Sequence, residues 1–281
     1  MILPSAARPV TLCSMYGEGD GNKWVLPRRY GFDAVRVTDI IEDGLDHVLT
    51  DPGHKWAEVD DKLRHYADES IGWVLDVSYV RNRLKAAGKN PYGTEARDTW
   101  QKALTAAYSH CKAYPPLWVS LAGEPELDTP IDTLIEFYKW AAGVCHGLSP
   151  RIPVCAGGWL HYDRLGGHRW GPRRSVVEAG CDIAAIHVYS EKDVESLAAT
   201  IASCHAVGAP CVVEEMGFDR GAASRQWLAY RWLRACIAAE ADGIGLWNFC
   251  GDENGQYALA PGRDDDLLAM MAQIQRGGEL A

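Results

Sequence analysis

Short apolar runs alternate along the chain with longer segments in which apolar residues recur at helical spacing. Runs of this length are typical of buried strands, and the longer segments are typical of helices that cover a sheet. The pattern predicts strands at Val10–Met15, Ala34–Thr38, Gly72–Tyr79, Leu117–Ala122, Val154–Gly157, Ile183–Val188, Pro210–Glu214 and Gly243–Phe249. It predicts helices at about Glu95–Cys111, Ile131–Cys145, Ser175–Glu178, Val194–His205, Gln226–Ala239 and Asp264–Gln275.

The order of these elements indicates parallel strands joined by crossover helices. The predicted strands are apolar at nearly every position, which fits a sheet that is covered on both faces. This number of units favours a closed (β/α)8 barrel, and a doubly wound open sheet is the structural alternative. No linker or tandem repeat divides the 281 residues. We therefore expect one α/β domain, a TIM barrel, over residues 1–281.

The charge of the chain narrows the choice of partner. The formal net charge is −10 and the pI is near 5.4. Nucleic acids and anionic membranes need a basic surface, so we expect neither as a partner, and a neutral substrate fits better. No apolar run approaches the ~18–20 residues of a transmembrane helix. The first apolar stretch, Val10–Leu12, resembles a strand more than the core of a secretion leader, and the sequence leaves native location and oligomeric state open.

Neither the cysteines nor the glycine-rich loops predict a cofactor or a metal. The 9 cysteines are dispersed singly, without a CxxC pair or a histidine at metal-site spacing, so we expect reduced, buried thiols. The loop Gly17–Asn22 lacks the Gly-Lys-Ser/Thr ending of a phosphate-binding loop. A Gly-x-Ser-x-Gly nucleophile elbow is absent as well.

Two predicted strands end in carboxylates. The fourth run leads into Glu124 and Pro125, and the seventh leads into Glu214 and Glu215. Because the active sites of such barrels lie at the C-terminal ends of the strands, we expect these glutamates at one barrel mouth. A retaining glycosidase needs one protonated carboxyl to donate to the leaving oxygen and one carboxylate to attack the anomeric carbon. Each has a plainer explanation when taken alone, Glu124 as a helix-start carboxylate and Glu215 as an ordinary strand end.

In these segments the chain resembles the glycoside hydrolases of clan A, in particular family 5, the cellulase and mannanase group. That family has an Asn-Glu-Pro acid/base motif at the end of strand four and a Glu-aromatic-Gly nucleophile motif at the end of strand seven. The resemblance covers essentially the whole chain. It implies that Glu124 is the acid/base and Glu215 the nucleophile. Their spacing suits three intervening βα units of roughly 30 residues each.

The same resemblance implies four substrate-binding or supporting residues. Arg36, in Asp33–Val37, matches the arginine that lies beneath the nucleophile. His187 and Tyr189 match the His-x-Tyr of strand six, where the histidine lines the site and the tyrosine hydrogen-bonds the nucleophile. Trp247 matches the floor of the −1 sugar site. A guanidinium and a phenol would favour ionised Glu215, and an indole offers a flat apolar face to a sugar.

The sequence departs from the family at several positions. Gly123 stands where the family has the Asn that bonds the 2-hydroxyl of the sugar. Either the −1 sugar is unusual or another side chain supplies this bond. Met216 replaces the usual aromatic residue after the nucleophile, and Asp76–Tyr79 lacks the histidine pair frequent in family 5.

Further polar and aromatic residues are weaker candidates for the mouth. Those that could reach a substrate or stack on a sugar are Asp39, Asp76, Tyr79, Trp24, Trp159 and Trp170. Glu126 and Glu214 are the neighbours that could be mistaken for the reacting pair. Glu214 has the opposite strand parity to Glu215, so we expect it to face away from the barrel axis.

The sequence therefore predicts a retaining glycoside hydrolase that cleaves a poly- or oligosaccharide by double displacement without a cofactor. Two alternatives stay open. One is a non-catalytic carbohydrate-binding barrel, for which Gly123 is the best support. The other is a transglycosylase that uses the same two glutamates. The sequence does not identify the sugar, the linkage, or whether cleavage is internal or terminal.

Overall fold

The computed structural model describes residues 8–15, 26–37, 56–125, 129–160, 170–249, 256–277 and 280. Its strands are β1 (Val10–Met15), β2 (Ala34–Val37), β3 (Gly72–Asp76), β4 (Val119–Ser120), β5 (Val154–Cys155), β6 (Ala184–Val188), β7 (Cys211–Met216) and β8 (Gly243–Phe249). Its α-helices are α1 (Leu26–Arg29), α3 (Trp56–Asp68), α4 (Tyr79–Ala86), α5 (Arg97–His110), α6 (Ile131–Leu148), α7 (Gly171–Val177), α8 (Glu191–His205), α9 (Arg225–Ala238) and α10 (Asp265–Gln275). Trp24, Asp39, Glu126 and the loop Gly17–Asn22 lie outside the described residues.

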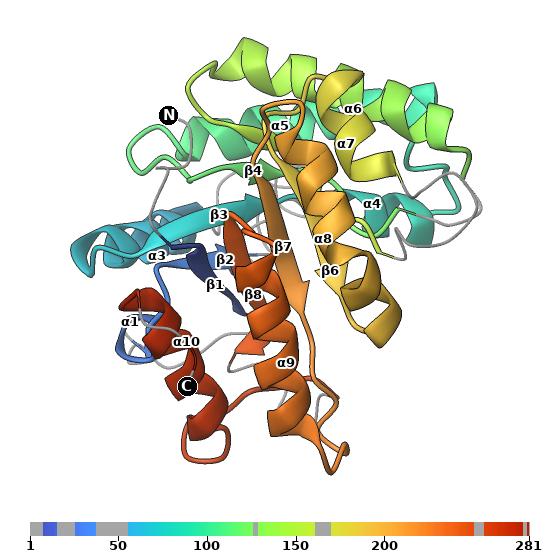
Figure 1. The fold of residues 1–281 in the computed structure, drawn as a ribbon. Coiled ribbons are helices and arrows are strands. Elements are labelled where there is room, and N and C mark those ends of the chain that lie inside the picture. The colour runs from blue at the N-terminus through green and yellow to red at the C-terminus, as the bar shows by residue number, and fades with distance from the viewer. Residues whose placement is uncertain are drawn as a thin grey trace.

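The strands form one parallel sheet that closes into a barrel. The order of neighbours is β5-β4-β3-β2-β1-β8-β7-β6. Parallel bridges from Cys155 to Ile183 and from Trp159 to Ile186 join the two ends of this order. Helices surround the strands, as Figure 1 shows. The predicted (β/α)8 barrel is confirmed, and the open doubly wound sheet is excluded because the first and last strands of the order are paired.

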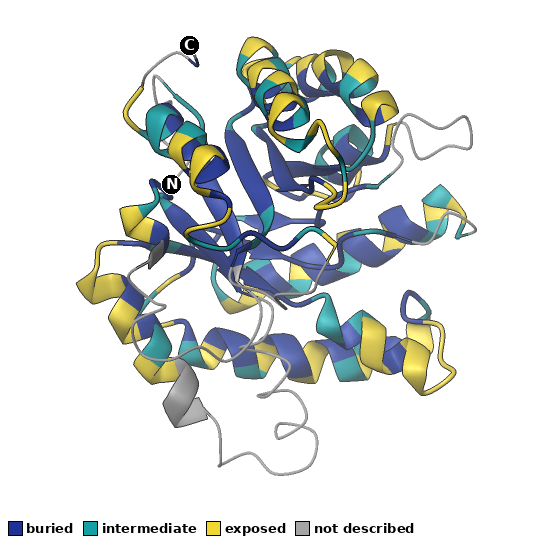
Figure 2. Ribbon diagram, turned by 90° about the horizontal axis from the view of Figure 1, so that it is seen from below, coloured by how far each residue is buried: buried dark blue, intermediate teal, exposed yellow. Residues whose placement is uncertain are grey.

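Two apolar layers hold the barrel together. The smaller fills the barrel interior with side chains from the strands and their flanks, namely Leu12, Ala34, Val74, Trp118, Cys155, Ile183, Ala185 and Val212. The larger lies between the strands and the surrounding helices. In Figure 2 the strands and the inner sides of the helices are buried, and the outer sides of the helices are exposed. This is the packing expected of a barrel whose interior is a filled core.

Several boundaries differ from the sequence prediction. The pattern did not predict α1, α3 or α4. β3 ends at Asp76, and Tyr79 starts α4, although the apolar run continues to Tyr79. β4 and β5 hold two residues each, but the amides of Leu121 and Ala122 still donate to the carbonyl oxygens of Cys155 and Ala156, so the pairing extends past the regular strand β4.

The cysteines have the environment that the sequence predicted. The 8 cysteines among the described residues are free and buried. Burial raises the pKa of the Cys111 thiol to about 12. Cys250 lies outside the described residues.

Candidate active site

A polar layer lies above the apolar interior layer, towards the C-terminal ends of the strands. Ala34, Val74 and Val212 belong to the interior layer. Each is followed two positions later by a buried charged residue, namely Arg36, Asp76 and Glu214. Because side chains alternate along a strand, residues two positions apart point to the same side. The change from apolar to charged residues therefore marks the floor of a site at the barrel mouth.

Arg36 is the central cation of this floor. Its side chain is 3% exposed and donates hydrogen bonds to Asp76 and Glu215, and to Ser14 Oγ at 3.3 Å. Burial alone would lower the pKa of Arg36, but the charges of Asp76 and Glu215 outweigh it and raise the pKa well above its usual value. The guanidinium also lies 5.8 Å from the ring centroid of Trp247. Arg36 is thus a fixed positive charge beneath Glu215.

Glu215, near the end of β7, is held from two sides. One carboxylate oxygen accepts from Arg36, and the other accepts from the Tyr189 hydroxyl at 2.5 Å. Two charge-stabilising donors of this kind favour a carboxylate and fix its rotamer. Gly217 leaves room for this contact, because a Cβ there would lie 2.4 Å from the Tyr189 ring.

Glu124 follows β4 in a left-handed backbone conformation, with φ of 52°. A non-glycine residue in this region is strained and occurs mostly where its surroundings hold it. Here the Glu124 amide donates to Gly158 O at 2.7 Å, and Arg81 donates to the carbonyl oxygens of Gly123 and Glu124. The side chain is 40% exposed, so it faces the mouth rather than the core.

His187 connects the carboxylates. Its Nδ1 lies 3.0 Å from Glu124 Oε1 and 3.4 Å from Glu215 Oε2, and its Nε2 lies 3.7 Å from Glu214 Oε2. Burial would lower the pKa of His187, but the charge of Glu215 and the contact with Glu124 raise it to about 10. A Cβ on Gly158 would lie 1.9 Å from the imidazole ring, so only glycine fits there without displacing it.

The pKa of Glu124 moves in the opposite direction. Burial would raise this pKa, but the hydrogen bond from His187 and the charges of His187 and Arg81 outweigh it and lower the pKa to about 2. The imidazole and the carboxyl group thus form an ion pair. One proton is held between these two groups.

The expectation that Glu214 faces away from the barrel axis is wrong. Its carboxylate accepts from Ser120 Oγ at 3.1 Å, from the Gly158 amide at 3.0 Å and from the Trp118 indole at 3.3 Å. Glu214 lies two positions beyond the interior residue Val212 and keeps its side. β7 then bulges, since Ile186 pairs with Val213 but His187 pairs with Glu215. The extra residue breaks the alternation, so two consecutive glutamates serve the barrel interior and the mouth.

A cleft of about 540 Å³ opens above these residues. All six residues that the sequence singled out line it: Arg36, Glu124, His187, Tyr189, Glu215 and Trp247. Asp76 and Tyr79 line it as well, whereas Trp159 is fully buried and Trp170, although half exposed, is not part of its wall.

The sequence interpretation missed part of the cleft wall. The additional lining residues are Ser78, Arg81, Asn82, Leu160 and Tyr257. Three of them belong to the turn after β3 and the first turn of α4. The polar residues that follow the end of β3 could have indicated this part of the wall. They were missed because the apolar pattern predicts a single strand over Gly72–Tyr79.

Three of the cleft residues could also approach one metal ion. The candidate ligand atoms are one oxygen each of Glu124 and Glu215 and one ring nitrogen of His187. They lie within 4.8 Å of one another, close enough for one ion, and this is the group of that kind found among the described residues. Both carboxylates, however, already accept hydrogen bonds from His187, Arg36 or Tyr189. The hydrogen bonds account for the cluster, and its chemistry is that of two carboxyl groups in different surroundings.

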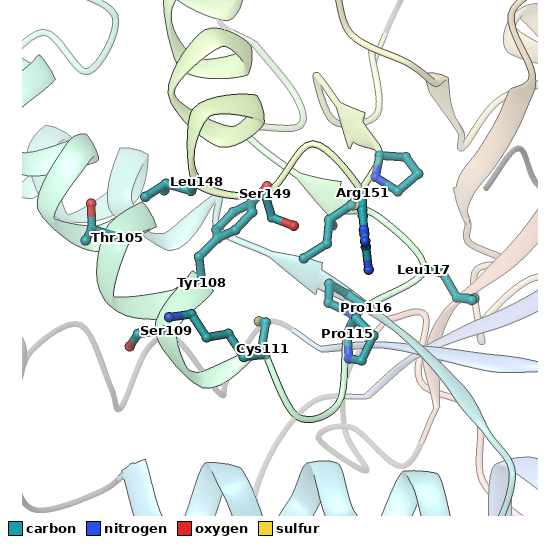
Figure 3. Close-up of a pocket in the computed structure, with 13 residues that line it drawn as sticks. Thr105, Tyr108, Ser109, Cys111, Pro115, Pro116, Leu117, Leu148, Ser149 and Arg151 are labelled. Atoms are coloured by element: carbon teal, nitrogen blue, oxygen red, sulfur yellow. The ribbon is translucent and has the colours of Figure 1, made fainter.

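A second pocket of about 650 Å³ lies at the opposite end of the barrel. Figure 3 shows it between the end of α5, the end of α6 and the segments that enter β4 and β5, with Tyr108, Pro115, Leu148 and Arg151 on its walls. Its lining contains no carboxylate. It is larger than the cleft, but the paired acids place the candidate chemistry in the cleft.

No helix in the described part of the chain is long and apolar enough to cross a lipid bilayer. No family model matches the chain, and the search of curated proteins finds no similar sequence.

Comparison with solved structures finds the same fold in glycoside hydrolases. An endo-β-1,4-mannanase from Thermotoga petrophila has a TM-score of 0.79 at 15% identity, over 100% of this chain and 80% of its own. An endo-1,4-β-mannanase from Rhizomucor miehei has a TM-score of 0.80 at 12% identity, over 96% and 95%. Thermotoga maritima Cel5A, solved with mannotriose, has a TM-score of 0.72 at 13% identity, over 93% and 97%. The family 5-like fold implied by the sequence motifs is thereby confirmed.

Proposed function

We propose that the chain is a retaining glycoside hydrolase in which Glu215 is the nucleophile and Glu124 the acid/base. The observation that carries the proposal is the pair of carboxylates at the ends of β4 and β7, with one oxygen of each within 4.8 Å of the other. Retaining glycosidases hold their carboxyl groups ~5–5.5 Å apart, whereas inverting enzymes need ~6.5–9.5 Å to admit a water molecule. The solved mannanases with this fold add support for carbohydrate as the substrate.

The surroundings of the two carboxylates suit different tasks. Glu215 is 5% exposed and receives hydrogen bonds from Arg36 and Tyr189, which favours the ionised form that attacks the anomeric carbon. Glu124 is more exposed and faces the cleft, where a departing glycosidic oxygen would lie. The Trp247 indole borders the same cleft and offers an apolar face to the sugar ring.

The proton for the leaving group comes from the pair of Glu124 and His187. In the geometry described this proton stays on the imidazole, because the neighbouring carboxylates favour the charged ring. A bound sugar removes water from Glu124, which penalises its ionised form and draws the proton to the carboxyl group. Glu124 then protonates the leaving oxygen while Glu215 bonds to the anomeric carbon. In the second step Glu124 takes a proton from water, and this water releases the sugar from Glu215.

We also propose that residues 1–281 form a single catalytic domain, since one barrel extends from β1 to α10. No separate binding module is needed for the chemistry described. Limited proteolysis that leaves one resistant core with full activity supports this, and two separable folded fragments contradict it.

The test of function begins with a panel of polysaccharides, including bacterial cell-wall glycans, and detection of new reducing ends. Glu124→Gln and Glu215→Gln should each lower kcat by about a thousandfold or more on a substrate that the wild type cleaves. The exposed Glu195→Gln on α8 is the matched control and should keep full activity. Wild-type-like turnover by Glu215→Gln would refute the assignment.

Stereochemistry and azide rescue test the mechanism itself. The first product should keep the anomeric configuration of the substrate, as observed by NMR. Azide should restore turnover of an activated aryl glycoside by Glu215→Ala with inversion, and by Glu124→Ala with retention. Glycan binding without turnover would favour the non-catalytic barrel, and products extended by an acceptor sugar would favour a transglycosylase.

A further inference from the structure

Position 123 cannot contribute a side chain to the sugar site. Gly123 immediately precedes Glu124, and a Cβ there would lie 3.3 Å from Gly158 N and 3.5 Å from the His187 ring. On the other side, Gly157 packs so closely that its own Cβ would lie 2.3 Å from Gly123 N. Three glycines thus meet at van der Waals distance beside Glu124. A polar group for the sugar at this point has to come from another element.

The first turn of α4 supplies polar groups at this place. The Arg81 guanidinium donates through Nη1 to the carbonyl oxygens of Gly123 and Glu124, and through Nε and Nη2 to Asn82 Oδ1, at 3.1 and 3.0 Å. One planar guanidinium thus links the Glu124 backbone to the Asn82 side chain. Both Arg81 and Asn82 line the cleft.

The contact with Arg81 fixes which way the Asn82 amide points. A guanidinium has only donors, so the atom that meets it must be the amide oxygen. The NH2 group of Asn82 therefore points away from Arg81, and within the described part of the chain its hydrogens meet no acceptor. Asn82 is an exposed residue, and the cleft is the space that its side chain borders.

We propose that Asn82 is a sugar-binding residue, whose NH2 group, oriented by Arg81, donates to a hydroxyl of the sugar that occupies the cleft beside Glu124. It thereby provides the amide contact that Gly123 cannot make. The inference rests on the proposed glycosidase function. If Asn82 makes this contact, the residue that selects for one sugar hydroxyl lies on α4 and not in the segment after β4.

Two substitutions at Asn82 separate a sugar contact from a supporting role. Asn82→Asp keeps an oxygen acceptor for both Arg81 bonds but has no NH2 donor, and Asn82→Ala lacks both. If the amide donates to the sugar, each variant should lose about five- to tenfold in kcat/KM, measured at its own pH optimum because the added carboxylate shifts the profile. Lys85→Ala, on the same helix, is the control and should match the wild type. Wild-type kcat/KM in Asn82→Asp would overturn the proposal, because Asn82 would then serve only as an acceptor for Arg81.

Monodeoxy substrates identify the contact directly. The wild type should lose activity on the analogue that lacks the bonded hydroxyl, and Asn82→Ala should show no further loss on that analogue. If the loss from Asn82→Ala and the loss from removing a hydroxyl multiply for every hydroxyl of the sugar, the inference is overturned. A wild type that cleaves no glycoside refutes both proposals. Hydrolysis that Glu215→Gln abolishes but neither Asn82 variant affects refutes this one alone.

Discussion

Glu124 has an unusual backbone conformation for a residue that must deliver a proton. Its φ of 52° is maintained by two contacts. The Gly158 carbonyl accepts from the Glu124 amide, and the Arg81 guanidinium donates to the carbonyl oxygens of Gly123 and Glu124. Left-handed conformations of this kind cost about 1–2 kcal/mol per residue and persist when neighbours hold them. Arg81 therefore acts on Glu124 in two ways, through geometry and through charge.

Substitutions of Arg81 should separate these two effects. Arg81→Met removes the charge that helps to lower the pKa of Glu124, so the alkaline limb of the kcat/KM profile should move to higher pH. Arg81→Lys keeps the charge but not the planar fork, so the limb should stay in place. Both should lose activity, by about ten- to a hundredfold, as Glu124 becomes less well positioned.

The pH profile reports more than Glu124 alone. Among the described residues, Arg36 from β2, Arg81 from α4, and Glu214 and Glu215 from β7 are the charged groups that face the pair of Glu124 and His187. The observed limb therefore belongs to the coupled proton of Glu124 and His187. A purely structural role for Arg81 predicts equal activity losses and no shift in either variant, and Lys85→Met should leave the profile unchanged.

At the scale of the elements, the tight contact between the segments after β4 and β5 determines how His187 is placed. Gly158→Ala adds a Cβ 1.9 Å from the imidazole, so the ring must leave the position in which its Nδ1 contacts Glu124. We expect about a hundredfold loss of kcat with a measurable fall in Tm. Kinetics and thermal unfolding by circular dichroism check both effects.

Gly143→Ala is the matched control for this substitution. Gly143 lies within α6, and a Cβ there meets nothing within 4 Å. Alanine in a helix interior is favoured over glycine by roughly 0.5–1 kcal/mol, so this variant should be slightly more stable and fully active. Full activity in Gly158→Ala would mean that the contact with His187 is not needed.

The elements also explain which parts of the site could be predicted from sequence. An apolar strand that ends in a carboxylate is a local pattern, so Glu124 and Glu215 could be assigned to the mouth. The resemblance to family 5 added Arg36, His187 and Trp247. A bulge is not local, because it depends on how β7 pairs with β6, and strand parity alone therefore misplaced Glu214. Arg81 and Asn82 were missed because the apolar run of β3 continues into α4, and periodicity over so few residues does not separate strand from helix.

At the scale of the whole molecule, the fold was predictable because its signal is repeated. Each βα unit provides an independent match to the same pattern, so errors of a few residues at single boundaries do not change the barrel assignment. The two-residue strands β4 and β5 illustrate this, since their segments were found although their bounds were not. The identity of the sugar has no such repeated signal and depends on a few side chains in one cleft.

The pairing of β5 with β6 closes the barrel through isolated bridges rather than through a continuous ladder. Strands β6 and β7 share five paired positions in one ladder. Among the described residues, the β5 and β6 segments are joined by the isolated bridges of Cys155 and Trp159, with backbone hydrogen bonds from Asp182, Ile183, Trp159 and His187. The amides of Trp159 and His187 should therefore exchange with solvent through openings of lower free energy than the amide of Val213. Native-state hydrogen exchange measures this, and equal protection at all three amides would contradict it. A barrel that opens between β5 and β6 becomes a sheet with two free edges, so the first partly unfolded form of this protein would also be the form most ready to pair with another chain.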